Sequence, residues 1–294
     1  MSKISGDKYF SSKLLLFGEY AIIKGGHGLA IPYSEFRGQL VLGEKETHKK
    51  FFELYDYINK SPLLAKKLDL KRFKADLDKG LYFDSNIPQG YGIGSSGALC
   101  AAIYQEYCTE KRITKLKELQ DYMALMESFY HGTSSGLDCL ISLVDQAVYI
   151  KDRKDVSTIN CPLLNDLGYF YLLDSKIERR TSPFVYKFLD RFENDQTYRE
   201  KFEKFIEMSN DTINSFLKAK RENFLFSIEK LSIMQREIMQ DMIPENIREF
   251  WDQGLESKKY FTKLCGAGGG GFFLVYSSER LELAELKQIK DGKL

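Results

Sequence analysis

A glycine-rich segment between an apolar stretch and a helical pattern is the first part of this sequence that could bind a ligand. It reads Pro88-Gln-Gly-Tyr-Gly-Ile-Gly-Ser-Ser-Gly97. Gly90, Gly92 and Gly94 would let the backbone approach a ligand without side-chain clash, and the following helix N-terminus would offer N–H groups to a phosphate. Ser95 and Ser96 add hydroxyl groups that could reach a phosphate or a magnesium ion. Without a ligand, the segment would be an ordinary glycine-rich turn.

Part of this segment also matches two better-known nucleotide motifs. Gly92 to Gly97 has the spacing of the G-x-G-x-x-G dinucleotide pattern, but no strand-plus-acid unit surrounds it. No lysine follows the glycines, so the segment is not a Walker A loop. A dinucleotide-binding oxidoreductase is therefore the weakest of the function classes that we consider.

A second glycine run lies near the C-terminus, in Lys263-Leu-Cys-Gly-Ala-Gly-Gly-Gly-Gly271. Five glycines within six residues cost conformational entropy and do not stabilise a fold. Close approach of the backbone to a ligand or to another loop explains them, and a flexible hairpin tip is the alternative.

Charged residues near these glycines could supply acid–base or metal chemistry. Asp138 follows a Ser/Gly turn and precedes an apolar run, which makes it a candidate base or, equally, the N-cap of the next helix. Glu127 lies at the end of a helical stretch, where a solvated residue is the ordinary interpretation. Lys13 opens an apolar strand, where a lysine usually extends its charged end to solvent. Glu19 follows Gly18, where a glutamate is usually an ordinary turn residue.

The elements that position these residues are strands and helices in both halves. We expect strands over residues 8–43, among them 13–17 and 20–23 with a bend at Gly18-Glu19 between them. Further strands are expected at 80–87, 168–174, 260–264 and 272–276. We expect helices from Ser95 (capped by Ser95 or Ser96) to about Cys108, from Thr114 to Tyr130 with a stop at Gly132, over most of 182–251, and from Glu279 onward. This mixture predicts an α+β protein, with one domain at 1–160 and another at 161–294.

Composition excludes several classes of function. The 294 residues carry 43 Lys+Arg against 42 Asp+Glu, so the net charge is +1, and this balance argues against a nucleic-acid binder. The five cysteines form no C-x-x-C pair and the three histidines are widely spaced, so we expect neither a disulfide framework nor a zinc site. No apolar run is long enough to span a membrane or to form a signal-peptide core, and we expect a cytoplasmic protein.

Together the motifs resemble the GHMP small-molecule kinase family, which includes galactokinase, homoserine kinase, mevalonate kinase and phosphomevalonate kinase. The three family motifs occur in the family's order between Lys13 and Tyr276. Within the family, the runs at 18–25, 131–138 and 263–271 are most similar to those of mevalonate kinases. The resemblance implies the two-domain GHMP kinase fold, with an N-terminal domain like domain 2 of ribosomal protein S5 and a C-terminal ferredoxin-like domain.

The resemblance also implies ATP and Mg²⁺ as cofactors and a small molecule as substrate. The reaction it implies first is the phosphorylation of mevalonate to 5-phosphomevalonate, a step in the synthesis of isoprenoid precursors. It makes Asp138 the base and Lys13 its cationic partner, with Ser96 and Glu127 as magnesium ligands. It assigns the nucleotide to Gly90, Gly92, Gly94, Ser95, Ser96, Gly97, Gly268 and Gly269, and the substrate to Lys13, Glu19, Tyr20 and Gly268. We expect no nucleic-acid or membrane partner, and a monomer or homodimer.

Two departures leave the acceptor open. Mevalonate kinases usually have His where this chain has Tyr20, and usually have Ala where it has Gly97; both residues are more typical of phosphomevalonate kinases. The alternatives are therefore phosphomevalonate or another small alcohol as substrate, and a non-catalytic ATP-binding sensor of the same fold. The catalytic set Lys13, Ser96, Glu127 and Asp138 argues against the sensor.

Overall fold

The computed structural model describes residues 8–43, 47–109, 115–152, 155–179 and 181–290. It divides into two compact units, each made of several segments of the chain. Unit 1 contains residues 1–13, 32–88 and 93–146, and unit 2 contains residues 14–31, 89–92 and 147–294. The sequence instead predicted contiguous domains, 1–160 and 161–294, and as a domain assignment that boundary stays a prediction.

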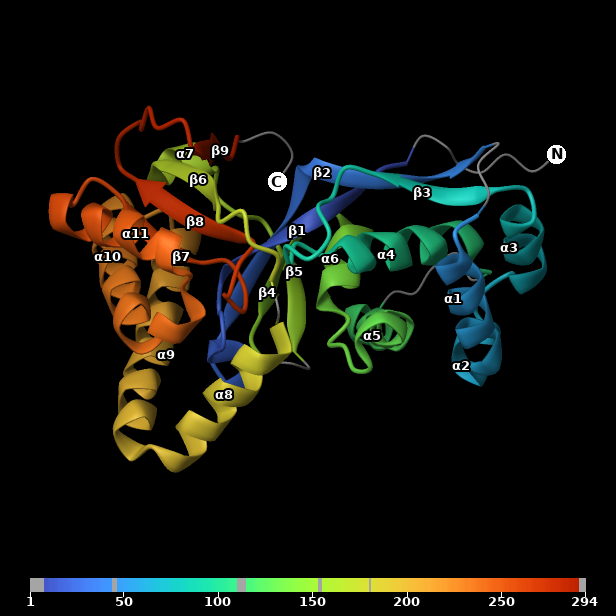
Figure 1. Cartoon of the computed structure of the whole chain (residues 1–294), viewed down its shortest axis with the longest axis horizontal. Helices are drawn as coiled ribbons and strands as arrows, with labels where there is room; N and C mark the ends of the chain where they lie inside the picture. Colours follow the sequence, from blue (N-terminus) through green and yellow to red (C-terminus); the bar gives the residue numbers. More distant parts are fainter. Residues whose placement is uncertain (1–7, 44–46, 110–114, 153–154, 180, 291–294) are drawn as a thin grey trace. The chain divides into compact units, whose positions relative to one another are not determined.

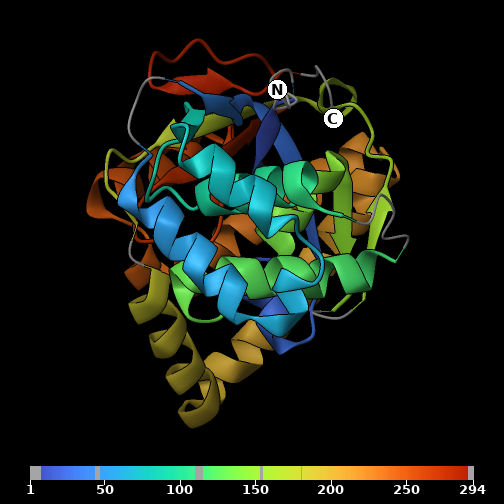
Figure 2. The same cartoon turned by 90° about the vertical axis from the view of Figure 1, so that its right-hand side faces the viewer.

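Two strands have residues in both units, and the other described elements of unit 1 are one strand and six helices. The shared strands are β1 (Phe10–Phe17) and β2 (Gly28–Leu42), and unit 1 adds β3 (Leu81–Ser85), which pairs antiparallel with β2. The helices are α1 (Lys49–Lys60), α2 (Pro62–Ala65), α3 (Leu70–Leu77), α4 (Ser95–Tyr107), α5 (Leu116–His131) and α6 (Leu137–Val144). They gather on one side of the β2–β3 pair (Figures 1 and 2).

Helix α4 is the central helix of unit 1. Alanines and apolar residues surround its axis on all sides, and residues 97–104 are buried, as expected for a helix enclosed by other elements. It packs closely against α6, and α5 packs against both. The glycine-rich motif and the Glu127–Asp138 motif therefore lie on helices that contact one another directly.

Unit 2 is built on an antiparallel sheet with strand order β7-β8-β6-β9. Its strands are β6 (Tyr169–Asp174), β7 (Phe261–Leu264), β8 (Phe272–Ser277) and β9 (Leu286–Gln288), and β4 (Ala147–Ile150) and β5 (Val156–Ile159) extend the β2 pairing. Its helices are η1 (Ala21–Lys24), α7 (Leu164–Leu167), α8 (Thr181–Asn194), α9 (Gln196–Leu217), α10 (Arg221–Ile238), η2 (Gln240–Met242) and α11 (Glu245–Ser257).

Aromatic rings form the core of unit 2. Phe17, Phe170, Phe216, Phe224 and Tyr276 are each at most 1% exposed and contact one another edge to face or at a tilt. A fully buried large apolar side chain contributes roughly 1.5–3 kcal/mol, so this cluster is a main source of stability. It joins β1 to β6, β8, α9 and α10.

Most predicted elements are present. The strands at 80–87, 168–174, 260–264 and 272–276, the helix from Ser95 and the helical region after 182 are confirmed. The helix predicted from Thr114 is confirmed from Leu116, with its C-cap at Gly132 (φ 73°); Thr114 itself lies outside the described residues.

Three local predictions are wrong. Residues 20–23 form a turn and the 3₁₀ helix η1 rather than a strand, because the apolar pattern there is too short to distinguish the two. The cap of α4 is Gly94 in the left-handed region, not Ser95 or Ser96. After Glu279 the chain forms irregular structure and β9 instead of a helix, and pairing with β6 supplies the backbone hydrogen bonds.

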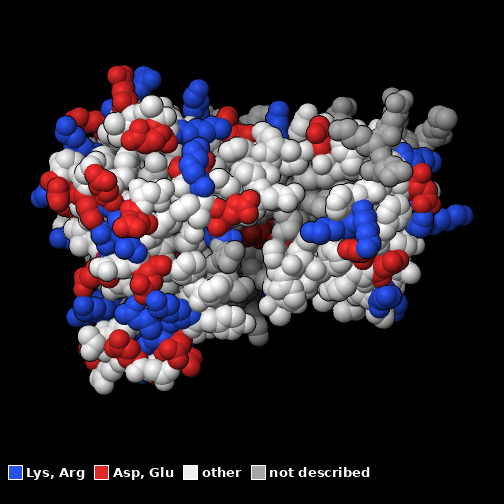
Figure 3. All heavy atoms as spheres, viewed as in Figure 1, with Lys and Arg blue, Asp and Glu red and all other residues white. Residues whose placement is uncertain are grey.

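The surface agrees with the small net charge. On the face drawn in Figure 3, Lys and Arg side chains alternate with Asp and Glu over the helices of unit 2. In the described parts of the chain, no helix has both the length and the apolar character needed to cross a membrane.

Candidate functional site

An ion pair at the start of α6 joins two of the predicted catalytic residues. Lys13 Nζ lies 2.9 Å from Asp138 Oδ1, with the two side chains 11% and 30% exposed. Asp138 is the second residue of α6, whose N-cap is Gly136, so the N-cap interpretation of Asp138 is wrong. Its carboxylate is partly open to solvent and beside a fixed cation, as a base for an incoming hydroxyl would need to be.

Two glycines of the first motif pack directly on this pair. A Cβ on Gly94 would lie 3.2 Å from Lys13 Cγ, and a Cβ on Gly97 would lie 2.8 Å from the carbonyl carbon of Asp138. Gly94 has φ 80°, a conformation that favours glycine. The N-terminus of α4, where N–H groups lack intrahelical partners, therefore begins beside the Lys13–Asp138 pair.

The second predicted pair, Ser96 and Glu127, is also brought together. Ser96 Oγ donates to Glu127 Oε1 at 3.2 Å and lies 3.0 Å from His131 Nε2. Ser134 Oγ donates to Glu127 Oε2 at 2.5 Å. Glu127 is buried, so its interpretation as a solvated helix residue is wrong.

The environment of Glu127 fits a hard cation. Burial, and then the negative charge of Asp138, raise the pKa of Glu127 to about 7. Two carboxylates in a poorly solvated place favour a bound positive charge, and carboxylate and hydroxyl oxygens are the donors that Mg²⁺ prefers. Among the described residues, no group of three or more His, Cys, Asp or Glu side chains could hold a metal by itself, so the remaining ligands would come from phosphate oxygens and water.

In unit 2, the predicted substrate residues Glu19 and Tyr20 contact the second glycine motif. Glu19 Oε1 accepts from Lys263 Nζ at 2.5 Å, and both side chains are about 1% exposed. Tyr20 donates its hydroxyl to the carbonyl oxygen of Ala267 at 2.6 Å. Gln235 on α10 completes the group by accepting from the Leu264 N–H at 2.9 Å.

Within unit 2, Arg179 lies between Gly90 and Gly92 of the first glycine-rich loop and Gly266 of the second. Its backbone N–H donates to Gly90 O at 2.8 Å. A Cβ on Gly92 would lie 1.9 Å from its Cζ, and one on Gly266 would lie 2.2 Å from its Nη1. The guanidinium group therefore occupies space that only glycines at these positions leave open.

The remaining predicted residues are placed as follows. Gly268 and Gly269 pack against Met242 and Phe184 respectively, with the Gly269 N–H donating to Met242 O at 2.6 Å. Ser95 is the first residue of α4 and is half-buried.

The predicted site residues thus form two groups, one in each unit. Unit 1 brings together Lys13, Ser96, Glu127 and Asp138, and unit 2 brings Glu19 and Tyr20 to the glycine loop. That both groups meet at one ligand stays a prediction.

Sequence reasoning missed some members of these groups. His131 was not among the predicted site residues, because nothing in the spacing linked it to Ser96. Ser134 was not among them either. Gln235 had a usable signal, because it continues the buried stripe Phe224, Ile228 and Leu231 of α10, and a polar residue on such a stripe needs a buried partner.

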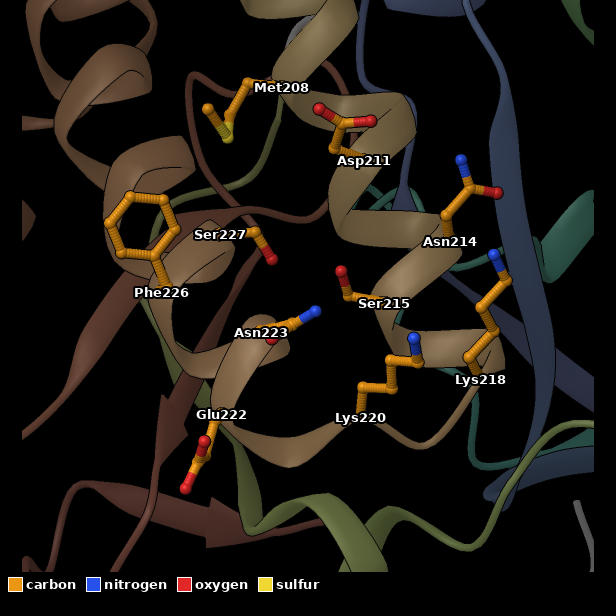
Figure 4. A pocket seen from close by; sticks show the side chains of 10 residues that line it. All are labelled: Met208, Asp211, Asn214, Ser215, Lys218, Lys220, Glu222, Asn223, Phe226 and Ser227. Atoms are coloured by element: carbon orange, nitrogen blue, oxygen red, sulfur yellow. The ribbon is translucent and has the colours of Figure 1, made fainter.

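A separate hollow lies between α9 and α10, with a volume of about 480 Å³. Asn214, Lys218, Lys220 and Asn223 are among its lining residues, and Figure 4 shows their side chains around it. It contains none of the motif residues. We therefore do not assign the predicted chemistry to it.

Comparison with solved structures shows that this chain has the same fold as several small-molecule kinases. The chain is similar to L. major mevalonate kinase in complex with R-mevalonate (16% identity, 95% of this chain and 90% of that chain, TM-score 0.66). It is also similar to Streptococcus pneumoniae phosphomevalonate kinase in complex with phosphomevalonate and AMPPNP (14%, 96% and 99%, 0.61) and to Lactococcus lactis galactokinase complexed with galactose (14%, 92% and 85%, 0.62). At these identities the likeness shows the fold alone.

A family model matches part of the sequence. Residues 56–146 match the model of the GHMP kinases N terminal domain, and further mevalonate kinases are among the similar structures. The resemblance seen in the motifs is therefore confirmed over residues 56–146, and the chain has an α+β fold like that of the similar kinase structures. None of the curated proteins compared with it matches this sequence.

Proposed function

We propose that this protein transfers a phosphoryl group from MgATP to the hydroxyl of a small hydroxy acid, and that the acceptor is mevalonate, giving 5-phosphomevalonate for isoprenoid precursors. The observation that carries the proposal is the Lys13–Asp138 ion pair, 2.9 Å long, beside the Gly94 cap of α4. The similar structures include one with R-mevalonate and one with AMPPNP bound, which supports the acceptor and the nucleotide.

In the proposed mechanism, Asp138 accepts the proton of the acceptor hydroxyl as the oxygen bonds to phosphorus. Lys13 fixes the direction of the Asp138 carboxylate through their ion pair, in which Nζ lies 2.9 Å from Oδ1. Gly97 holds Asp138 in place by allowing α6 to pack on α4 without an intervening Cβ. A positioned base of this kind is worth ~10²–10⁴ in rate.

The N-terminus of α4 would hold the phosphates. Its unpaired N–H groups and the positive end of its dipole favour anions. Ser96 and Glu127 would hold Mg²⁺, which, when bound, neutralises charge on the transferring phosphoryl group. Ser134 and His131 would keep these two ligands oriented through their hydrogen bonds.

The charges near the motifs support an acceptor without a phosphate. A phosphorylated acceptor adds about −1.5 to −2 at pH 7 and needs convergent cations. Lys13 is paired with Asp138 and Lys263 with Glu19. Lys24 contacts Glu193 and the Phe192 ring, and Arg37 lies over the Tyr9 ring. These four cations already have partners.

Phosphomevalonate is the second candidate, and one observation favours it. Arg179 lies beside both Gly92 and Gly266, where a guanidinium group could bind an acceptor phosphate bidentately. Arg180, which would be its natural companion, lies outside the described residues. The cytoplasmic location and the monomeric or homodimeric state also stay predictions.

Release of ADP from MgATP over a panel of mevalonate, phosphomevalonate, galactose and homoserine tests the proposal. We expect mevalonate to give the highest kcat/KM, and the Asp138→Ala protein to give none above background. A kcat/KM for phosphomevalonate more than about tenfold higher, ~1.4 kcal/mol in transition-state binding, would reassign the acceptor. Nucleotide binding without turnover on any acceptor would favour the sensor.

A further inference from the structure

Two consecutive residues, Glu19 and Tyr20, are hydrogen-bonded to the second glycine motif, one at its start and the other in its middle. We propose that Glu19 and Tyr20 are positioning residues, which fix the loop from Lys263 to Gly271, and that they do not bind the substrate through their polar groups. This inference rests on the proposed function, because it assumes that the loop contacts a ligand of the kinase reaction. It replaces the substrate-binding roles that the sequence predicted for these two residues.

Tyr20 holds the middle of the loop through a hydrogen bond, the first of two contacts that we call ties. Its hydroxyl donates to Ala267 O at 2.6 Å, and its ring is 5% exposed and lies 4.8 Å from that of Phe188 on α8. A hydroxyl already donating to a buried carbonyl has no second proton for a substrate. Tyr20 also has φ 59°, an uncommon value for a bulky residue, and such strain persists only where the surroundings impose it.

Glu19 forms the tie at the start of the loop. Its carboxylate accepts from Lys263 Nζ, which also donates to the carbonyl of Leu264, both at 2.5 Å. Gln235 accepts from the Leu264 N–H and approaches Glu19 Oε2 at 3.5 Å. Both oxygens of Glu19 therefore face protein donors, and with 2% of the residue exposed no edge of the carboxylate is open to an acceptor.

The loop itself explains why two ties are needed. Of its six residues from Gly266 to Gly271, five are glycines, and all five have positive φ. Such a segment has many accessible conformations when it is not held. Holding the loop in one conformation keeps the reacting groups in the geometry that the reaction needs, and a misplacement of about 1 Å can cost ~10²-fold in rate. The ties should therefore affect how well the loop is placed for reaction more than how strongly the acceptor binds.

The test measures the order of the loop directly, in the full-length protein without nucleotide or acceptor. Hydrogen–deuterium exchange of peptides covering 264–271 is compared between the unaltered protein and Tyr20→Phe, which removes the hydroxyl and keeps the ring. We expect exchange in these peptides to accelerate about fivefold, which corresponds to the loss of one net hydrogen bond. The matched control is Tyr186→Phe on α8, where the tyrosine is 73% exposed and no change is expected.

A second variant tests the other tie. The double change Glu19→Gln with Lys263→Met leaves no buried charge unpaired, which neutral side chains of similar volume tolerate. We expect it to fold and to show faster exchange at 264–271. Unchanged exchange in both variants would overturn the proposal, and unchanged exchange in only one would remove that residue from it.

Kinetics separates positioning from substrate binding. For Tyr20→Phe we expect kcat to fall about fivefold with the KM for the acceptor within twofold. A large rise in KM with unaltered loop exchange would assign Tyr20 to the substrate instead. If the protein phosphorylates none of the acceptors, the proposed function fails, but the exchange measurement still tests both ties.

Discussion

Removing Lys263 alone should destabilise this protein strongly, although the residue lies in a motif associated with ligand binding. In Lys263→Met the methionine fills most of the space of the lysine stem, and Glu19 loses its cation. Both members of the pair are about 1% exposed, so solvent cannot replace the lost partner. The change therefore isolates the cost of leaving one buried carboxyl group unpaired.

The magnitude follows from burial. Breaking a fully buried ion pair by removing one partner costs about 3–5 kcal/mol. For domains of 150–250 residues, each kcal/mol moves Tm by roughly 2–4 °C. We expect the Tm of Lys263→Met to fall by roughly 6–20 °C at pH 8.

The loss should depend on pH in a definite direction. Burial already raises the pKa of Glu19 above 4.5, and the charge of Lys263 partly opposes that rise. Without Lys263 the pKa rises further. A carboxyl whose pKa is higher when folded than when unfolded contributes stability below its unfolded pKa and loses it as pH rises through its folded pKa. The destabilisation should therefore shrink as pH falls, by at most about 1.4 kcal/mol per pH unit.

Urea and thermal unfolding at pH 5.5 and pH 8 measure both effects. The control is Lys259→Met, four residues earlier and exposed, for which we expect a change within about 0.5 kcal/mol. A Tm for Lys263→Met equal to that of the control would refute the cost that we assign to the buried pair. A loss as large at pH 5.5 as at pH 8 would refute the assignment of that cost to an ionised Glu19.

Three further predictions concern the reaction, and each is measured by ADP release. Asp138→Ala should lower kcat by at least ~10² while nucleotide affinity, measured by titration, stays nearly unchanged; an active variant would remove Asp138 from the mechanism. Glu127→Gln should raise the Mg²⁺ concentration needed for half activity, because an amide oxygen is a weaker ligand for a hard cation; an unchanged requirement would leave Glu127 with a structural role only. Arg179→Ala should leave mevalonate turnover within about threefold and lower any phosphomevalonate turnover at least tenfold, and the reverse pattern would contradict our choice of acceptor.

The sequence was informative where a local signal decides the structure. Glycine spacing and a following apolar helix located α4 and its N-terminus, and the Ser/Gly turn located Asp138. Glycine at C-cap positions is favoured by its freedom at positive φ, which is why the end of α5 at Gly132 was predictable. Family motifs then brought Ser96 to Glu127 and Lys13 to Asp138, pairs separated by 31 and 125 positions in the chain.

The sequence did not predict the structure correctly where contacts between distant segments determine it. The apolar run after Gly18 has the composition of a strand, yet it forms a turn and η1, and the Tyr20 hydroxyl bonds a residue 247 positions away. Polar residues near the C-terminus suggested a helix, but β6 has an open edge there and β9 pairs with it. Neither outcome is encoded in local periodicity, because tertiary hydrogen bonding overrides a weak local preference.

A sequence motif identifies positions where the residue type matters. It does not show whether that residue contacts a ligand or only other parts of the fold. Exposure helps to separate the two. The side chains of Lys13 and Asp138 are 11% and 30% exposed, so an acceptor could still reach the carboxylate. Those of Glu19 and Lys263 are each 1% exposed and satisfy one another. Residues of the second kind can act on chemistry only by holding the glycine loop in place, so substitutions there should change loop order and protein stability before they change the affinity for a substrate.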